Sequence, residues 1–100
     1  MIKVRKGGYT VLDLSNVALT ASGSDYIGTV PVKAYTALKY GDKPVMVSGL
    51  KIGSINYSDS LATYKVDSGT MVTVYYLIVA GKYISIEVSN NGNVKATVHV

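Results

Sequence analysis

Residues 30–50, VPVKAYTALKYGDKPVMVSGL, contain the only helical pattern in the chain and run directly into a strand pattern. Pro31 suits the first turn of a helix, where its missing N–H is not needed. Gly41 stands where a glycine commonly follows the last helical residue, and Pro44 prevents the helix from continuing. We therefore predict a short helix at residues 31–40, followed at once by a strand.

The predicted helix has one apolar face. Ala34, Ala37 and Leu38 follow the i, i+3, i+4 spacing that places side chains on the same side of a helix. A helix this short is not stable in isolation, so its apolar stripe must be buried against another element. We expect that element to be a β-sheet or a neighbouring subunit.

The rest of the chain consists of short apolar–polar runs separated by turn residues, a pattern typical of strands. Residues 21–25 are small and polar and predict a loop, and residues 71–80 are apolar on both faces, which predicts a central strand covered on both sides. The predicted strands are residues 2–5, 9–14, 26–30, 45–48, 61–66, 71–80, 83–88 and 94–100.

Together these elements predict a mainly β fold, either sandwich-like or a partly open barrel, of about seven to eight strands with one short helix. With 100 residues, we expect a single domain that spans residues 1–100. The longest apolar run is too short to cross a bilayer, and we expect neither a signal peptide nor a membrane association. Because the chain has no cysteine, we expect no disulfide framework and no thiolate metal site.

The net charge of +4 raises the question of nucleic-acid binding. Proteins that bind nucleic acids concentrate basic residues on one face and usually favour arginine. Here the lysines are dispersed, there is one arginine, and only Lys3, Arg5 and Lys6 form a cluster. The charge pattern therefore favours a solubilising role over a phosphate-binding face.

Tyrosine is the only aromatic residue type, with nine copies and no Phe or Trp. A tyrosine ring with its polar tip suits both the rim of a small core and a wet contact surface, and the sequence leaves both interpretations open. As candidate partner-interface residues we select the basic cluster together with two loop-proximal tyrosines. The candidates are Lys3, Arg5, Lys6, Tyr26 and Tyr57.

No residue pattern indicates catalysis. Asp13 and Glu87 lie on similar Gly-x-Tyr strands and would form a two-carboxylate site only if those strands were neighbours. His99 is the single histidine, so it has no second histidine or cysteine with which to hold a metal ion. No nucleophile elbow and no phosphate-binding glycine loop is present. We expect no enzyme activity, no catalytic residues, no metal and no cofactor.

Two stretches carry a resemblance to a family. LDLSNVAL at residues 12–19 is followed, after the predicted helix, by KPVMVSGLKIG at residues 43–53 and then by short strands to the end of the chain. This order resembles small accessory structural proteins of tailed bacteriophages, of the head-fibre or auxiliary capsid (decoration) type. The resemblance implies a β-rich virion component that forms homo-oligomers, trimers among them, and attaches to a phage capsid or tail protein.

Two other functions remain open from the sequence. One is a carbohydrate-binding or adhesion module that uses exposed tyrosines beside Asn- and Asp-containing loops. The other is a nucleic-acid-binding β-barrel, which the dispersed charge disfavours.

Overall fold

The computed structural model describes residues 2–4, 10–41, 44–57, 60–77 and 81–99, and within them the side chains of all but residues 2–4 and 60. The fold is mainly β, with one short helix, as predicted. The helix α1 spans Val32–Tyr40. The strands are β1 Ile2–Val4, β2 Thr10–Asp13, β3 Thr20–Ser22, β4 Asp25–Thr29, β5 Val45–Ser48, β6 Lys51–Ile52, β7 Ile55–Asn56, β8 Ser60–Leu61, β9 Tyr64–Ser68, β10 Met71–Leu77, β11 Tyr83–Ser89 and β12 Asn93–His99.

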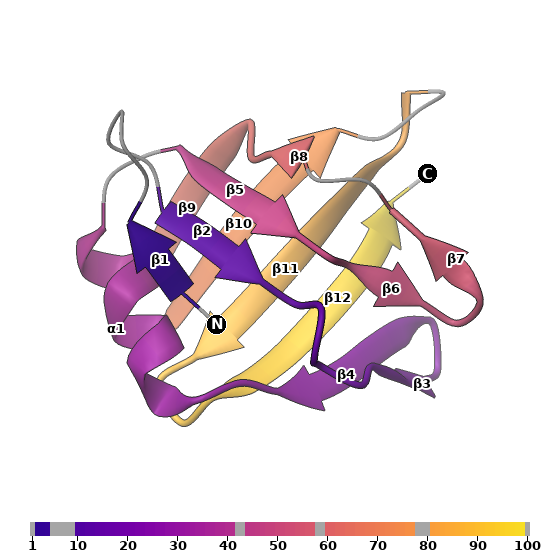
Figure 1. The fold of residues 1–100 in the computed structure, drawn as a ribbon, viewed down its shortest axis with the longest axis horizontal. Helices are drawn as coiled ribbons and strands as arrows, with labels where there is room; N and C mark the ends of the chain where they lie inside the picture. The colour runs from indigo at the N-terminus through magenta and orange to yellow at the C-terminus, as the bar shows by residue number, and fades with distance from the viewer. Residues whose placement is uncertain (1, 5–9, 42–43, 58–59, 78–80, 100) are drawn as a thin grey trace.

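The strands form two main sheets that face each other with their strands in crossed directions (Figure 1). The smaller sheet has the order β1-β2-β5-β8 and the larger one the order β3-β4-β12-β11-β10-β9. The larger sheet is antiparallel throughout, whereas β2 and β5 pair in parallel. A parallel pair needs a long crossover connection, and here that connection contains β3, β4 and α1.

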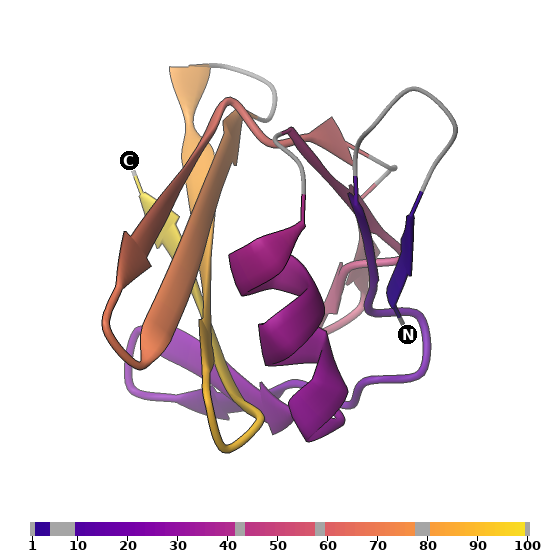
Figure 2. The same cartoon turned by 90° about the vertical axis from the view of Figure 1, so that its left-hand side faces the viewer.

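The helix α1 lies between the two sheets and covers the open side of the sandwich (Figure 2). Its buried side chains are Ala34, Tyr35 and Leu38. The expected stripe was Ala34, Ala37 and Leu38, so Tyr35 takes the place of the half-buried Ala37. Tyr35 also donates a hydrogen bond from its hydroxyl to the carbonyl of Gly69, at 2.8 Å, which ties the helix to the turn between β9 and β10.

Gly41 ends the helix for a different reason from the one expected. Its φ of −83° and ψ of 171° are extended, not left-handed. A Cβ at this position would collide with the side-chain hydroxyl of Thr10 on β2 and with the carbonyl of Ala37. Glycine is therefore required at position 41 by the close approach of helix and sheet, and not by a left-handed backbone conformation.

The core lies between the inner faces of the two sheets and the helix. Val72, Val74 and Tyr76 of β10 all point inward and are at most 1% exposed. The three inward residues of β11 are likewise completely buried. These residues, Ile84, Ile86 and Val88, follow the apolar alternation of the strand predicted at residues 83–88.

Several sequence predictions need correction. The described residues hold twelve strands rather than seven or eight, because several are only two or three residues long, below what an alternation pattern resolves. The loop expected at 21–25 contains parts of β3 and β4, whose small polar residues form an exposed hairpin. The strand expected at 61–66 is divided into β8 and β9, one in each sheet. The strand β10 is internal to its sheet, but its outer face is only partly covered, since Thr73 is 8% exposed and Leu77 is 60% exposed. Residues 78–80 of the strand expected at 71–80 lie outside the described residues.

Candidate interaction surface on the six-stranded sheet

The outer face of the larger sheet carries five of the nine large exposed hydrophobic side chains among the described residues: Ile27, Tyr64, Val66, Leu77 and Tyr83. Its register places residues from neighbouring strands side by side in rows across the sheet. One row runs from Tyr64 through Tyr75, Ser85 and Thr97 to Asp25. A second, parallel row joins Leu77, Tyr83 and His99, and a third runs through Val66, Thr73, Glu87, Lys95 and Ile27.

Aromatic rings gather at one end of this face. Tyr64 stacks on Tyr75 with ring centroids 4.6 Å apart, and Tyr83 stacks on His99 at 4.5 Å. Tyr75 also lies 6.1 Å from Tyr83, which joins the two pairs into one cluster. We call this surface the aromatic patch; it comprises Tyr64, Val66, Tyr75, Leu77, Tyr83 and His99.

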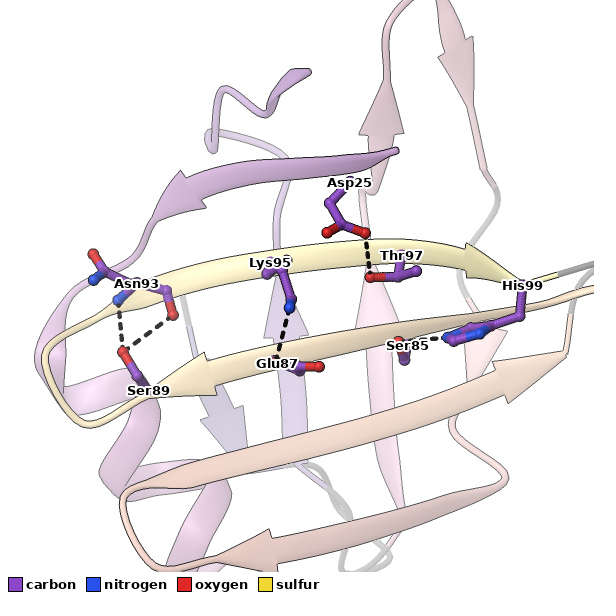
Figure 3. A network of polar contacts seen from close by, with 8 residues as sticks. All are labelled: Asp25, Ser85, Glu87, Ser89, Asn93, Lys95, Thr97 and His99. Atoms are coloured by element: carbon purple, nitrogen blue, oxygen red, sulfur yellow. Dashed lines mark hydrogen bonds and ion pairs between the residues drawn. The ribbon is translucent and has the colours of Figure 1, made fainter. Parts of the chain in front are cut away.

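The rings of the patch are fixed by their neighbours. Cross-strand stacking of this kind stabilises the sheet and holds each ring in one orientation. His99 is held further by a hydrogen-bonding contact between its Nε2 and the hydroxyl of Ser85, at 2.8 Å (Figure 3).

The Ser85–His99 contact resembles one half of a hydrolase triad, which makes its accessibility important. Ser85 is only 3% exposed, so its hydroxyl is covered by the surrounding side chains. Asp25 accepts a hydrogen bond from Thr97 at 2.9 Å, and no carboxylate of the described residues contacts His99. The pair therefore orients the histidine ring and offers no accessible nucleophile.

The other end of the face is concave, and its surface is mainly apolar with polar groups among the lining residues. An open depression of about 820 Å³ lies over β4, β12 and β11. Lys95 and Glu87 form a loose ion pair in it, with 3.7 Å between Nζ and Oε1 (Figure 3). Asn91 and Asn93 lie at its edge, where Ser89 hydrogen-bonds to both. We call this surface the depression; its lining is Ala18, Thr20, Ile27, Gly28, Thr29, Met71, Glu87, Ser89, Asn91, Asn93, Val94 and Lys95.

The candidate interface residues chosen from the sequence do not lie together on this face. Tyr26 faces the interior from β4, and both Tyr26 and Tyr57 are half-buried against the core. Lys3 belongs to β1 of the other sheet, and its side chain is not described. Arg5 and Lys6 lie outside the described residues. Tyr26 and Tyr57 were selected without knowledge of strand pairing, and only the register of β9 to β11 distinguishes the outward rings from the inward ones.

The described residues add neither a carboxylate pair nor a metal-binding group to this surface. Asp13 and Glu87 lie on strands of different sheets, so the two-carboxylate arrangement that required neighbouring strands is not formed. Within the part of the chain that the structure describes, no group of three or more His, Asp or Glu side chains could hold a metal ion. None of the described residues forms a helix long and apolar enough to cross a membrane.

Comparison with known proteins identifies no relative. No protein-family model matches the chain, and neither a curated protein nor a solved structure matches it at a significant level.

Proposed function

We propose that this chain is a structural binding module that attaches to another protein through the outer face of its six-stranded sheet, as an accessory component of a phage virion. The observation that supports attachment is the aromatic patch, which keeps large apolar side chains exposed on a rigid sheet. Exposed patches of this kind usually mark contact surfaces. The virion context rests on the sequence resemblance to phage accessory proteins, with a capsid or tail protein as the partner.

The composition of the patch favours a protein partner. Protein interfaces are enriched in tyrosine and poor in charged residues at their centre. Tyr64 and Tyr83 are 54% and 38% exposed, and the patch contains no Asp, Glu, Lys or Arg. The pre-stacked rings lose little side-chain freedom on binding, which reduces the entropic cost of association.

The test is to purify particles of the phage that encodes this chain. Mass spectrometry of the purified particles then shows whether the chain is present in them. The Leu77→Lys variant should lose incorporation, since it places a charge in the patch. Ile55→Lys should keep it, because Ile55 is similarly exposed, at 55%, but lies on β7 outside the six-stranded sheet. Absence of the wild-type chain from the particles would refute the virion assignment.

A carbohydrate-binding function is the second candidate, and the depression, with its mixture of apolar surface and hydrogen-bonding groups, is the observation that favours it. Its volume of about 820 Å³ falls within the range of small-molecule sites. Its lining is mainly apolar, as at Ile27 and Met71, and carries amides, hydroxyls and the Glu87–Lys95 pair as polar groups. Such a lining suits a neutral, hydroxyl-rich ligand. Glycan-array binding that is lost in Asn93→Ala and kept in Leu77→Lys would favour this candidate over protein attachment.

A further inference from the structure

We propose that Asn91 is a deamidation site that the folded β11–β12 turn protects, and that it converts to aspartate or isoaspartate when this turn opens. The inference is independent of the proposed function, because it rests on the chemistry of one dipeptide and on the hydrogen bonds around it. It concerns the chemical lifetime of the folded chain and the charge at the edge of the depression.

The Asn91–Gly92 dipeptide has the covalent structure in which asparagine most readily loses its amide. The backbone nitrogen of Gly92 attacks Cγ of Asn91 to form a cyclic succinimide. The bond from Cγ to Nδ2 breaks, and ammonia leaves with the proton that the Gly92 nitrogen gives up. One water molecule then opens the ring at either carbonyl, which yields aspartate or isoaspartate. Glycine favours ring closure because it has no Cβ to crowd the attack, and of the five asparagines in the chain only Asn91 precedes a glycine.

The nucleophile of this reaction is occupied in the folded turn. The N–H of Gly92 donates a hydrogen bond to the carbonyl oxygen of Ser89 at 2.9 Å, and Gly92 is buried. A backbone amide whose proton is held by an acceptor and shielded from water loses that proton slowly. Ring closure therefore requires this hydrogen bond to break.

The side chain that supplies the electrophile is also held in place. Oδ1 of Asn91 accepts hydrogen bonds from the hydroxyl of Ser89 and from the N–H of Asn93, the second at 3.3 Å. The N–H of Asn93 also lies 3.2 Å from the hydroxyl of Ser89 (Figure 3). The bond from the Asn93 N–H to the Asn91 side chain is an Asx turn, in which a side-chain carbonyl takes the place of a backbone one. These bonds restrict the rotations of Asn91 that ring closure needs.

The turn is further anchored to neighbouring segments. The carbonyl oxygen of Gly92 accepts a hydrogen bond from the N–H of Val30 at 2.8 Å, and the N–H of Asn90 donates to the carbonyl oxygen of Thr70 at 2.9 Å. Gly92 lies so close to Val30 that a Cβ at position 92 would overlap the carbonyl oxygen of Val30. Because the reaction needs the turn to be released from its contacts, its rate in the folded protein reports how often the turn opens.

Deamidation would change the surface beside the turn. Asn91 belongs to the lining of the depression, so one new carboxylate adds negative charge there and lowers the net charge of the chain from +4 to +3. The isoaspartate product also carries its main chain through Cβ, which lengthens a turn that is fixed at Ser89 and Val30. We expect the isoaspartate form to unfold at a lower temperature than the unmodified chain.

Incubation of the full chain in mildly alkaline buffer, with and without guanidinium chloride, tests the inference. Peptide mapping by mass spectrometry locates the products, and enzymatic methylation of isoaspartate quantifies them. In the unfolded chain Asn91 should be the main site of deamidation, and folding should slow its reaction about tenfold or more. Asn91→Gln should abolish the product, because a glutamine side chain would have to close a larger ring.

Two serine variants test the contacts of the turn. Ser89→Ala removes the hydroxyl that contacts Asn91 and Asn93, and it should raise the rate several-fold in buffer but not in guanidinium chloride. Ser22→Ala is the matched control, since Ser22 is an exposed serine of β3, and it should change neither rate. Circular dichroism establishes that each variant is folded in buffer.

The outcomes that would overturn the inference are specific. Equal rates for the wild type in buffer and in guanidinium chloride would show that the turn gives no protection, whatever the variants do. A product located mainly at another asparagine of the unfolded chain would remove Asn91 as the site. A folded Ser89→Ala protein that deamidates no faster than the wild type would show that the hydroxyl of Ser89 does not restrain Asn91.

Discussion

The ammonium group of Lys65 lies 2.6 Å from the carbonyl oxygen of Leu38, in the last turn of α1. Lys65 is on the edge strand β9, faces the interior and is only 6% exposed. A second contact, at 3.4 Å, joins it to the carbonyl of Gly41. The lysine therefore supplies a hydrogen-bond donor and a positive charge to the carbonyl end of a helix, where both are favourable.

Replacing this lysine by an apolar residue of similar length should destabilise the fold. Lys65→Met would leave the carbonyl of Leu38 without its donor, and we expect a loss of about 2 kcal/mol in the free energy of unfolding. Lys33→Met is the matched control, since Lys33 is an exposed residue of the same helix and should change stability by less than about 0.5 kcal/mol. Urea unfolding measures both. An equally stable Lys65→Met protein would mean that the cost of burying the ammonium cancels its hydrogen bonds.

The glycine that follows the helix provides a second prediction. Gly41→Ala should cost about 2 kcal/mol or more, because the added Cβ would overlap the hydroxyl of Thr10 and the backbone carbonyl of Ala37. Gly53 has a φ of +62° and open space around its Cβ position, so Gly53→Ala should cost only about 1 kcal/mol of backbone strain. Thermal unfolding of the two variants compares the destabilisation caused by steric overlap at position 41 with that caused by backbone strain at position 53. The opposite order of stability would contradict the close approach of helix and β2.

Sequence patterns predicted most of the architecture where apolar and polar residues alternate cleanly. The strand β5 was predicted with its observed ends, because Pro44 and Gly49 delimit it. The helix was predicted to within one residue because Pro31 and Pro44, on either side of it, constrain the backbone locally. Such local signals do not depend on which strands become neighbours.

The features that depend on pairing were not predictable in this way. Lys65 was not singled out, because its partner carbonyl belongs to a helix far away in sequence. The patch was missed because Tyr64 and Tyr75 become neighbours only through the register of β9 and β10. Tyr26 and Tyr57, which were chosen instead, are half-buried at the core. Nothing in the composition distinguishes these tyrosines from each other.

The stacked pair in the patch should be measurably coupled. We expect a double-mutant cycle with Tyr64→Ala and Tyr75→Ala to give a coupling energy of about 0.5 to 1.5 kcal/mol in the free energy of unfolding, since the ring centroids are 4.6 Å apart. Tyr64→Ala combined with Tyr40→Ala is the control cycle, because Tyr40 lies on α1 and is 78% exposed. That cycle should be additive. Coupling below about 0.3 kcal/mol in the first cycle would contradict the stacked arrangement.

Tyr76 is a buried residue whose hydroxyl has no hydrogen-bond partner among the described residues, although its side chain is only 1% exposed. Removing an unpaired buried hydroxyl should be favourable, so Tyr76→Phe should raise the free energy of unfolding by about 1 kcal/mol and the melting temperature by about 4 to 8 °C. Tyr35→Phe should act in the opposite direction, with a loss of about 1 kcal/mol, because it removes the hydrogen bond to Gly69. A destabilised Tyr76→Phe protein would show that this hydroxyl has a stabilising partner.

Burial also gives Tyr76 a predictable effect at alkaline pH. Desolvation raises the pKa of its hydroxyl above the ordinary value of 10.0, because the phenolate is poorly accommodated in the core. The folded state therefore keeps this proton at pH values where the unfolded chain loses it. Below about pH 10 the group has no effect on the pH dependence of stability, and above it the folded state should lose about 1.4 kcal/mol per pH unit.

The variant Tyr76→Phe isolates this contribution, because it removes the hydroxyl of Tyr76 and leaves the rest of the sequence unchanged. Urea unfolding at about pH 9 and about pH 11 should show the stability gap between variant and wild type widening by roughly 1 kcal/mol at the higher pH. A gap that stays constant between the two pH values would indicate that the phenolate of Tyr76 is tolerated in the folded protein, and hence that its hydroxyl reaches water.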